Sequence, residues 1–200
     1  MSQHTNGRKV IANINISIDG RYAAPENPID MSWVIPYATT DVGRDHMTNF
    51  WKNATTAVLG RVNAEGFLGF WPTMIGAEGV DPRDEAFAQW LVDVEKVVFS
   101  STLTEPAWDR TTIENRAAGE AIAELKQTDG GDIVVLSSAS IIKALLEADA
   151  VDTLSMMIFP VFLGGGPRLF EDGLPSAEWS LTSQATSENG AISLVYDRIR

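Results

Sequence analysis

Hydrophobic and polar positions along the chain fall into segments that are typical of strands. Residues 9–18 alternate, with isoleucines at 14, 16 and 18 on one face, and the turn residues Asp19-Gly20 follow. Residues 132–136 (DIVVL) form a continuous apolar run, which is expected of a strand covered on both faces. By the same criteria we expect further strands at residues 56–59, 96–100, 112–113, 153–161, 179–185 and 191–198.

Helices are predicted between these strands. Thr40-Asp41 can begin a helix that runs to residue 53, with Val42, His46 and Phe50 near one stripe. Other helices are expected at residues 63–70, 82–91, 117–127 and 140–148, and residues 188–190 (ENG) favour a hairpin between the last two strands. The pattern predicts an α/β fold with a mixed, mostly parallel central sheet, flanking helices and a C-terminal antiparallel hairpin.

The chain of 200 residues is expected to form a single domain, because this length lies within the usual range and no linker divides it. The polar segment 1–8 is expected to be a disordered tail. Residues 22–35 contain Pro25 and Pro28 and show little periodicity, so they are predicted to form a loop of uncommon length. Long ordered loops are often functional.

Composition narrows the possible functions. The formal charge of −12 without any basic run argues against a nucleic-acid partner. With no cysteine and only His4 and His46, neither a thiolate nor a histidine-rich metal site is expected, and no metal is assigned. The beginning of the chain is polar and no segment has the length of a membrane span, so we expect a cytoplasmic protein with no membrane partner.

Three of the predicted strands end in turns of glycine or small polar residues: residues 60–61, 100–102 and 137–140. In an open α/β sheet, ligands bind outside the carboxyl ends of the strands, where helix N-termini attract anions. Each turn alone is more often an ordinary turn or helix cap, but together they predict a dinucleotide groove. Arg61 is the only cation on these turns and is the candidate for a phosphate contact, although a solvated surface arginine is an equally good interpretation.

Several motifs resemble the dihydrofolate-reductase-like superfamily, and most closely its riboflavin-biosynthesis reductase branch (the C-terminal domain of RibD). Residues 17–20 (SIDG) resemble the first-strand signature of that branch, and residues 31–36 (MSWVIP) and 60–63 (GRVN) resemble dihydrofolate-reductase motifs. Residues 100–103 (SSTL) are similar to the turn that receives the adenosine end of NADPH. The most specific likeness is that of residues 149–170 (DAVDTLSMMIFPVFLGGGPRLF) to the riboflavin-reductase tail motif.

The resemblance implies NADPH as cofactor and transfer of a hydride to a C=N or C=O carbon of a small pterin-like or pyrimidine-like heterocycle. Two departures stand out. Ser137-Ser138 replace the family's Gly-Gly or Gly-Ser, and Leu136 replaces an acidic residue, so the substrate is not expected to be a riboflavin precursor. The cofactor-binding residues implied are Gly60, Arg61, Val62, Asn63, Ser100, Ser101, Thr102, Ser137, Ser138, Ala139, Ser140 and Ile141.

The candidate catalytic residues are Asp19 and Asp45, either of which could deliver a proton. A turn role for Asp19 and a solvated helix charge for Asp45 are open alternatives. Aligning residues 50–52 (FWK) with the family's aromatic-lysine step puts Met47 at the place of the dihydrofolate-reductase acid, which disfavours true dihydrofolate reduction and leaves the general acid unassigned.

Trp33, Lys52 and Phe67 are the candidate substrate-binding residues, although core packing for the aromatic residues and a surface position for Lys52 are the commoner outcomes. The resemblance also implies a homodimer, with residues 154–161 near its interface. A second hypothesis is a non-catalytic nucleotide-binding or ligand-binding homodimeric protein of the same fold, because Ser137 could narrow the cofactor passage.

Overall fold

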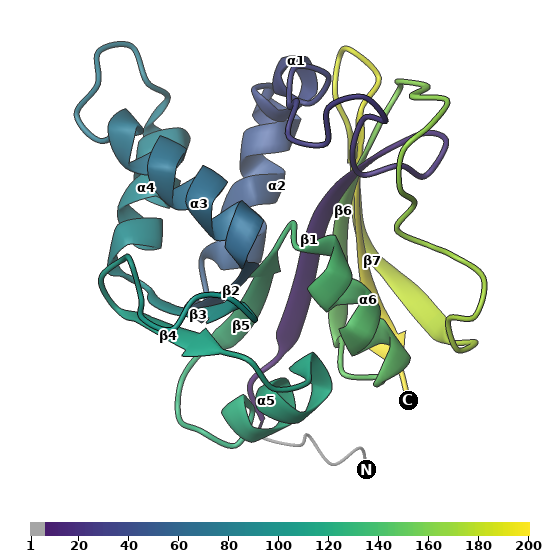
Figure 1. Cartoon of the computed structure of the whole chain (residues 1–200). Coiled ribbons are helices and arrows are strands. Elements are labelled where there is room, and N and C mark those ends of the chain that lie inside the picture. The colour runs from purple at the N-terminus through teal and green to yellow at the C-terminus, as the bar shows by residue number, and fades with distance from the viewer. Residues whose placement is uncertain (1–6) are drawn as a thin grey trace.

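A computed structural model describes residues 7–200 of the chain, in which one eight-stranded sheet has helices on both faces (Figure 1). The strand order is β4-β3-β2-β5-β1-β6-β8-β7. The first six strands in the chain are parallel to one another, and β8 is antiparallel to both β6 and β7. The predicted mixed, mostly parallel sheet with a C-terminal antiparallel hairpin is confirmed. The strands are β1 (Val10–Ser17), β2 (Ala54–Gly60), β3 (Glu95–Phe99), β4 (Thr111–Glu114), β5 (Asp132–Leu136), β6 (Thr153–Phe159), β7 (Glu178–Thr186) and β8 (Ile192–Ile199).

The helices form two layers (Figure 1). One layer covers the face where Phe50, Leu59 and Phe87 pack, and the other covers the face where Ile14, Val58 and Ile142 pack. None of the helices in residues 7–200 combines the length and the apolar character that a bilayer crossing requires. The first layer contains α2 (Asp41–Trp51), α3 (Arg61–Phe70) and α4 (Pro82–Asp93), the second contains α5 (Ala118–Leu125) and α6 (Ala139–Glu147), and two short elements are α1 (Ile35–Ala38) and η1 (Trp71–Met74).

Strand β1 shows how the alternating pattern divides the core. Val10, Ala12 and Ile14 pack in the cluster that includes the α6 residues Ile142 and Leu145, whereas Ile11 points to the opposite face. The strand ends at Ser17, before the turn at Asp19-Gly20. Ile18 was expected to continue the buried face, but it lies beyond the strand and is 59% exposed.

Residues 1–8 were predicted to form a disordered tail, and this prediction is wrong for Arg8. Residues 1–6 lie outside the described part of the chain, but Arg8 is buried two residues before β1 begins. Its guanidinium donates hydrogen bonds to the carbonyl oxygen of Gly131 at 2.7 Å and to the hydroxyls of Thr128 at 2.8 Å and Thr56 at 2.5 Å. The sequence did not predict these hydrogen bonds of Arg8, because their acceptors lie about 50 to 120 residues further along the chain.

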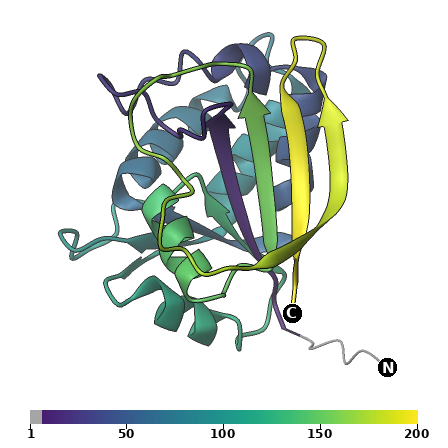
Figure 2. The same cartoon turned by 90° about the vertical axis from the view of Figure 1, so that its right-hand side faces the viewer.

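The outer edges of the sheet are β4 and β7. Figure 2 shows β7 and β8 as a long hairpin at the margin of the molecule. The β7–β8 ladder contains a register shift between Leu181 and Ser183, so the outer strand bulges at its middle. Strand β6 is an interior strand with mostly buried side chains. The position of residues 154–161 near a dimer interface stays a prediction.

The turn after β1 closes against the segment that follows β6. The backbone N–H of Tyr22 donates to Pro167, and that of Leu169 donates to Gly20. The Arg21 guanidinium donates to the carbonyl oxygen of Gly166. Gly166 has a φ of 86°, and a Cβ there would lie 2.3 Å from the carbonyl oxygen of Ala23. The motifs at residues 17–20 and 149–170 are therefore parts of one structural unit, and this unit requires glycine at position 166.

A buried polar cluster ties α2 to three strands. His46 lies on the stripe of α2 that faces the sheet and is 5% exposed. Its Nε2 lies 3.1 Å from the Ser155 hydroxyl of β6 and 3.4 Å from the Asn13 amide nitrogen of β1. Its Nδ1 lies 2.7 Å from the Ser193 hydroxyl of β8. Burial removes the imidazole from water and lowers the pKa of His46 to about 4.

Replacing Gly166 with alanine should strongly destabilise the protein. The added methyl group strains the left-handed backbone and collides with Ala23, so we expect the free energy of unfolding in urea to fall by about 3 kcal/mol. Gly164→Ala is the matched control, because Gly164 has a similar φ of 71° but open space around its Cβ position. It should lower the same free energy by only about 1 kcal/mol. Equal losses would contradict the packing argument.

The stability of the protein should fall between pH 7 and pH 5 because of His46. The folded pKa of about 4 lies below the usual value of 6.5, so the unfolded chain binds the proton first as the pH falls. Urea unfolding should show a loss of about 2 kcal/mol over this range. His46→Gln should be less stable at pH 7 but should lose most of this pH dependence. An unchanged slope would contradict the assignment.

Candidate active site

The parallel strands bring the predicted ligand turns to one edge of the sheet. Strands β3, β2 and β5 are consecutive neighbours and point the same way, so their carboxyl ends lie side by side. The turns at residues 60–63, 100–102 and 137–141 follow these ends directly. With about 4.8 Å between neighbouring strands, the three turns span about 10 Å of this edge. The predicted convergence of the turns on one edge is confirmed.

Side chains join the turns after β2 and β5. The Gly60 backbone N–H donates to the Ser138 hydroxyl at 2.9 Å, and that hydroxyl donates to the Leu136 carbonyl oxygen at 2.9 Å. The Asn63 amide donates to the same carbonyl oxygen at 3.2 Å. Helices α3 and α6 begin at these turns, so the N-termini of two helices lie at neighbouring strand ends.

Ser137 occupies the position that departs from the family pattern. Its backbone N–H donates to the Asn13 carbonyl oxygen at 2.9 Å, and its φ is 47°. This left-handed conformation explains a preference for glycine, because a side chain there costs about 1 kcal/mol. Ser137 is half-buried, so its hydroxymethyl group stands at the boundary between the turn and solvent.

The other cofactor candidates divide into exposed and structural positions. Arg61 is partly exposed, and its guanidinium pairs with Glu65 at 2.7 Å. The Ser100 hydroxyl accepts hydrogen bonds from the backbone N–H groups of Thr102 at 3.1 Å and Leu103 at 2.9 Å, which shapes the turn after β3. The exposed residues are Val62, Ser101, Thr102 and Ser140, whereas Ala139 and Ile141 have buried side chains.

Asp19 lies at the same edge, beyond the end of β1, and anchors a loop. Its carboxylate accepts hydrogen bonds from the Ser17 hydroxyl at 2.6 Å and from the backbone N–H groups of Leu163 at 3.1 Å and Gly164 at 3.0 Å. Partial desolvation acts to raise the pKa of Asp19, but these hydrogen bonds outweigh it and lower the pKa to about 2. The group is therefore a carboxylate at neutral pH.

Asp45 faces the outside of α2. Its side chain is 65% exposed and lies 2.8 Å from the Arg83 guanidinium of α4. Arg83 also pairs with Asp41 at 2.6 Å and with Asp81 at 2.9 Å, and these carboxylates raise its pKa. Asp45 is thus part of a surface charge network that links α2 to α4.

The predicted substrate residues lie in different places. Trp33 packs edge-on against Phe159, with ring centroids 5.8 Å apart, at the carboxyl end of β6. Its indole N–H is buried without a hydrogen-bond partner among the described residues. Phe67 packs in the core beneath α3. Lys52 is exposed just before β2 begins, about 20 Å of strand away from the turn at Gly60. The structure brings Trp33, but not Lys52, to the edge of the sheet.

His46 was not among the predicted site residues. It is the α2 side chain that reaches β1, β6 and β8, whereas Met47 packs toward the core cluster on the α4 side. A signal was present in the sequence: a histidine on the apolar stripe of α2, together with asparagines at positions 13 and 15 of a strand whose other residues are apolar or small. The partners Ser155 and Ser193 could not be paired with it from sequence.

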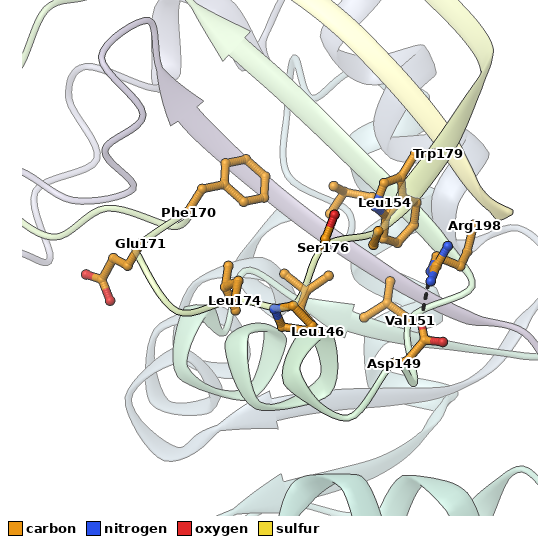
Figure 3. A pocket seen from close by; sticks show the side chains of 12 residues that line it. Leu146, Asp149, Val151, Leu154, Phe170, Glu171, Leu174, Ser176, Trp179 and Arg198 are labelled. Carbon is orange, nitrogen blue, oxygen red and sulfur yellow. Dashed lines mark hydrogen bonds and ion pairs between the residues drawn. The ribbon is translucent and has the colours of Figure 1, made fainter. Parts of the chain in front are cut away.

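Two cavities lie away from this edge. The larger has a volume of about 400 Å³ and lies on the α6 side of the sheet, near the beginning of β6. Figure 3 shows Phe170, Leu174 and Trp179 around it, with Arg198 paired to Asp149 at its rim. Its largely apolar lining has none of the turns described above. The smaller cavity, of about 370 Å³, lies between α2 and strands β6, β8 and β7.

Comparisons with known proteins agree with this architecture. The chain is 27% identical over 192 residues to the uncharacterized protein YwjB of Bacillus subtilis (strain 168), a match that covers 96% of this chain and 98% of YwjB. A candidate riboflavin biosynthesis protein from Shewanella sp. PV-4 superposes with a TM-score of 0.72 at 21% identity, covering 96% of this chain and 99% of the other. A dihydrofolate reductase from Enterococcus faecalis, solved in complex with NADP(H) and RAB-propyl, superposes with a TM-score of 0.57 at 16% identity, covering 96% of this chain and 97% of the other.

The solved structures show that the fold is dihydrofolate-reductase-like, as the sequence motifs implied. The model of the RibD C-terminal domain matches residues 8–193, which is nearly the whole chain. The matched range includes all the turns at the carboxyl edge of the sheet and the paired segments around Asp19 and Gly166. The chain belongs to the RibD C-terminal domain family.

Proposed function

We propose that the protein is an NADPH-dependent reductase that transfers a hydride to a small heterocyclic substrate, either pterin-like or pyrimidine-like. The observation that carries the proposal is the convergence of three turns and two helix N-termini at one edge of the sheet. The family and the solved relatives, which include a riboflavin-pathway candidate and an NADP(H) complex, favour the same chemistry.

The donors at this edge fit a dinucleotide phosphate. The first N–H groups of α3 and α6 carry partial positive charge, and the guanidinium of Arg61, which is paired with Glu65 on one side, offers its remaining N–H groups. These local charges act at contact distance, where they outweigh the repulsion from a chain of net charge −12. When bound, the cofactor supplies the hydride, and the protein supplies position and exclusion of water.

The residues around the edge have separable roles in this proposal. Gly60, Asn63 and Ser138 hold two turns in register, while Arg61, Ser101 and Thr102 offer exposed donors to phosphate and ribose oxygens. Asp19 keeps the loop at Leu163 in place through its carboxylate. Asp19 is ionised at neutral pH and Asp45 is paired with Arg83, so the proton that follows the hydride is expected to come from water.

Arg61→Gln should weaken NADPH binding about tenfold, because a charge-assisted contact to phosphate is lost. The measurement is titration of NADPH while tryptophan emission is followed, with energy transfer to the reduced nicotinamide as the signal. Arg110→Gln is a matched control: Arg110 is also exposed and paired with a glutamate, Glu95 at 2.5 Å, but it lies just before β4, at the opposite edge of the sheet.

Comparing Arg61→Gln with Arg110→Gln distinguishes a phosphate contact from a general effect of charge. Weaker binding in both would indicate a general electrostatic effect rather than a phosphate contact. Absence of any emission change at millimolar NADPH in the unchanged protein would contradict the reductase proposal itself.

A second candidate is a non-catalytic nucleotide-binding or ligand-binding protein with the same fold. Two observations favour it: the side chain of Ser137 stands where the family has glycine, and both carboxylates considered as acids are already engaged. Such a protein would bind nucleotide or another ligand without oxidising NADPH in the presence of dihydropterins or aminopyrimidines. Both proposals include a homodimer, which sedimentation can test. Both also include a cytoplasmic location.

Ser137→Gly tests whether that side chain limits the cofactor passage. Glycine adopts a φ of 47° without strain, so the variant should keep its free energy of unfolding within about 1 kcal/mol. If the hydroxymethyl group narrows the passage, NADPH should bind several-fold more tightly than it does to the unchanged protein. Weaker binding would instead indicate that the Ser137 hydroxyl donates to phosphate.

A further inference from the structure

One side of the sheet is uncovered at its outer strands. Figure 2 looks onto β6, β8 and β7, and no helix of residues 7–200 lies over β8 or β7 in this view. The side chains on this side follow from the ladders, because directly opposite residues share a face. Leu194 lies opposite Met156 and Tyr196 lies opposite Leu154, and both β6 residues belong to the core cluster on the α6 side. The bare face, as we name it, comprises Ile158, Leu181, Gln184, Ile192, Leu194 and Tyr196.

The bare face is mostly apolar and carries no charge. Leu181 is 46% exposed, Ile192 is 38% exposed, and Leu194 and Tyr196 are half-buried. None of its six residues is ionisable at neutral pH, although the whole chain has a formal charge of −12. A sheet ordinarily buries an apolar face against another layer of structure, and a continuous exposed apolar patch marks an interaction surface. The partner that covers this face must therefore supply apolar surface rather than charge.

The area of the bare face fits a weak dimer. Strands of this length, at about 3.4 Å per residue and about 4.8 Å apart, present with their side chains a surface of about 25 Å by 20 Å. Two such faces in contact bury about 1,000 Å² in total, which is the lower limit for a specific interface. A second copy brings an identical uncharged face, and two sheets pack face to face about 10 Å apart. We expect a dissociation constant on the order of micromolar.

Complementary features lie at the two ends of β6. Phe162, beyond the carboxyl end of the strand, is 74% exposed. The cavity of about 400 Å³ lies near the beginning of the strand, on the α6 side, and Val151, Leu154 and Trp179 are among its lining residues (Figure 3). A two-fold axis that relates two facing copies lies in the plane between them. An axis that runs across the strands at Met156, the middle residue of β6, exchanges the two ends of this strand.

We propose that a second copy of the chain covers the bare face, in a two-fold arrangement that inserts the partner's Phe162 into this cavity. Each copy gives one phenylalanine ring and receives one, so the interface is self-complementary and closed. The ring packs on the apolar side chains of the cavity, which removes exposed apolar surface from water in both copies. Because two copies of charge −12 repel each other, added salt strengthens the dimer. The inference rests on the homodimer of the proposed function but not on the reductase chemistry.

Sedimentation of the whole chain at micromolar concentrations measures the dimer, and two pairs of variants locate it. Leu181→Lys places a charge on the bare face and should give a monomer, whereas Ser180→Lys places the same charge on the other face of β7 and should remain dimeric. Phe162→Ala should weaken the dimer at least about tenfold. Phe70→Ala is its control, because Phe70 is also exposed but ends α3 on the opposite side of the sheet.

Cross-linking tests the orientation of the two copies, and the absence of cysteine from the chain makes it selective. Phe162→Cys and Ser176→Cys, a residue that lines the cavity, are prepared as separate proteins. A short bismaleimide should join the two variants when they are mixed. It should not join either variant to itself, because the arrangement places each Phe162 against the other copy's cavity.

The proposal is overturned if the chain stays monomeric at high micromolar concentration, or if Ser180→Lys dissociates the dimer as fully as Leu181→Lys does. It is also overturned if salt dissociates the dimer, or if the mixed cysteine variants cross-link no faster than each variant alone. NADPH titration of Leu181→Lys should match that of the unchanged protein. Normal NADPH binding by a monomer would therefore remove this interface and leave the reductase proposal standing.

Discussion

The parallel arrangement of six strands is the constraint on which the rest of this structure depends. Because β1 to β6 run in one direction, each must end at the same edge, and whatever follows it is delivered there. Turns that are 40 residues apart in the chain therefore become neighbours without any direct attraction between them. The side-chain contacts of Ser138 and Asn63 refine this arrangement rather than create it.

The local pattern was sufficient to predict these elements. Continuous apolar runs and glycines at the strand ends located every strand to within a few residues. Strand direction follows where a helix separates two strands, but β3 and β4 are parallel without a helix between them. The motifs at residues 17–20 and 149–170 were recognised separately in the sequence, and the structure explains both through one set of contacts around Asp19, Arg21 and Gly166. The contact between the turn after β1 and the segment after β6 joins residues that are distant in the sequence, so the hydrophobic periodicity of the chain does not predict it.

The features that the sequence did not reveal involve polar residues whose partners are distant. Arg8 looks like part of a polar tail, yet it binds oxygen atoms near residues 56, 128 and 131. Lys96 is 2% exposed and donates to three carbonyl oxygens at the end of α4, although lysine is ordinarily a surface residue. His46 is the same kind of case. Burial of a polar group is decided by whether hydrogen-bond partners surround it, and that is a property of the assembled sheet.

The bulge in β7 has a consequence for the behaviour of the molecule at high concentration. An outer strand with unpaired backbone groups can recruit a strand from another molecule, and β7 carries Glu178 as its only charged residue and no proline to oppose this. The register shift between Leu181 and Ser183 divides the strand into two short halves that do not lie in one flat ribbon. Such a bulge is one of the features that keep edge strands of natural proteins from pairing with other molecules.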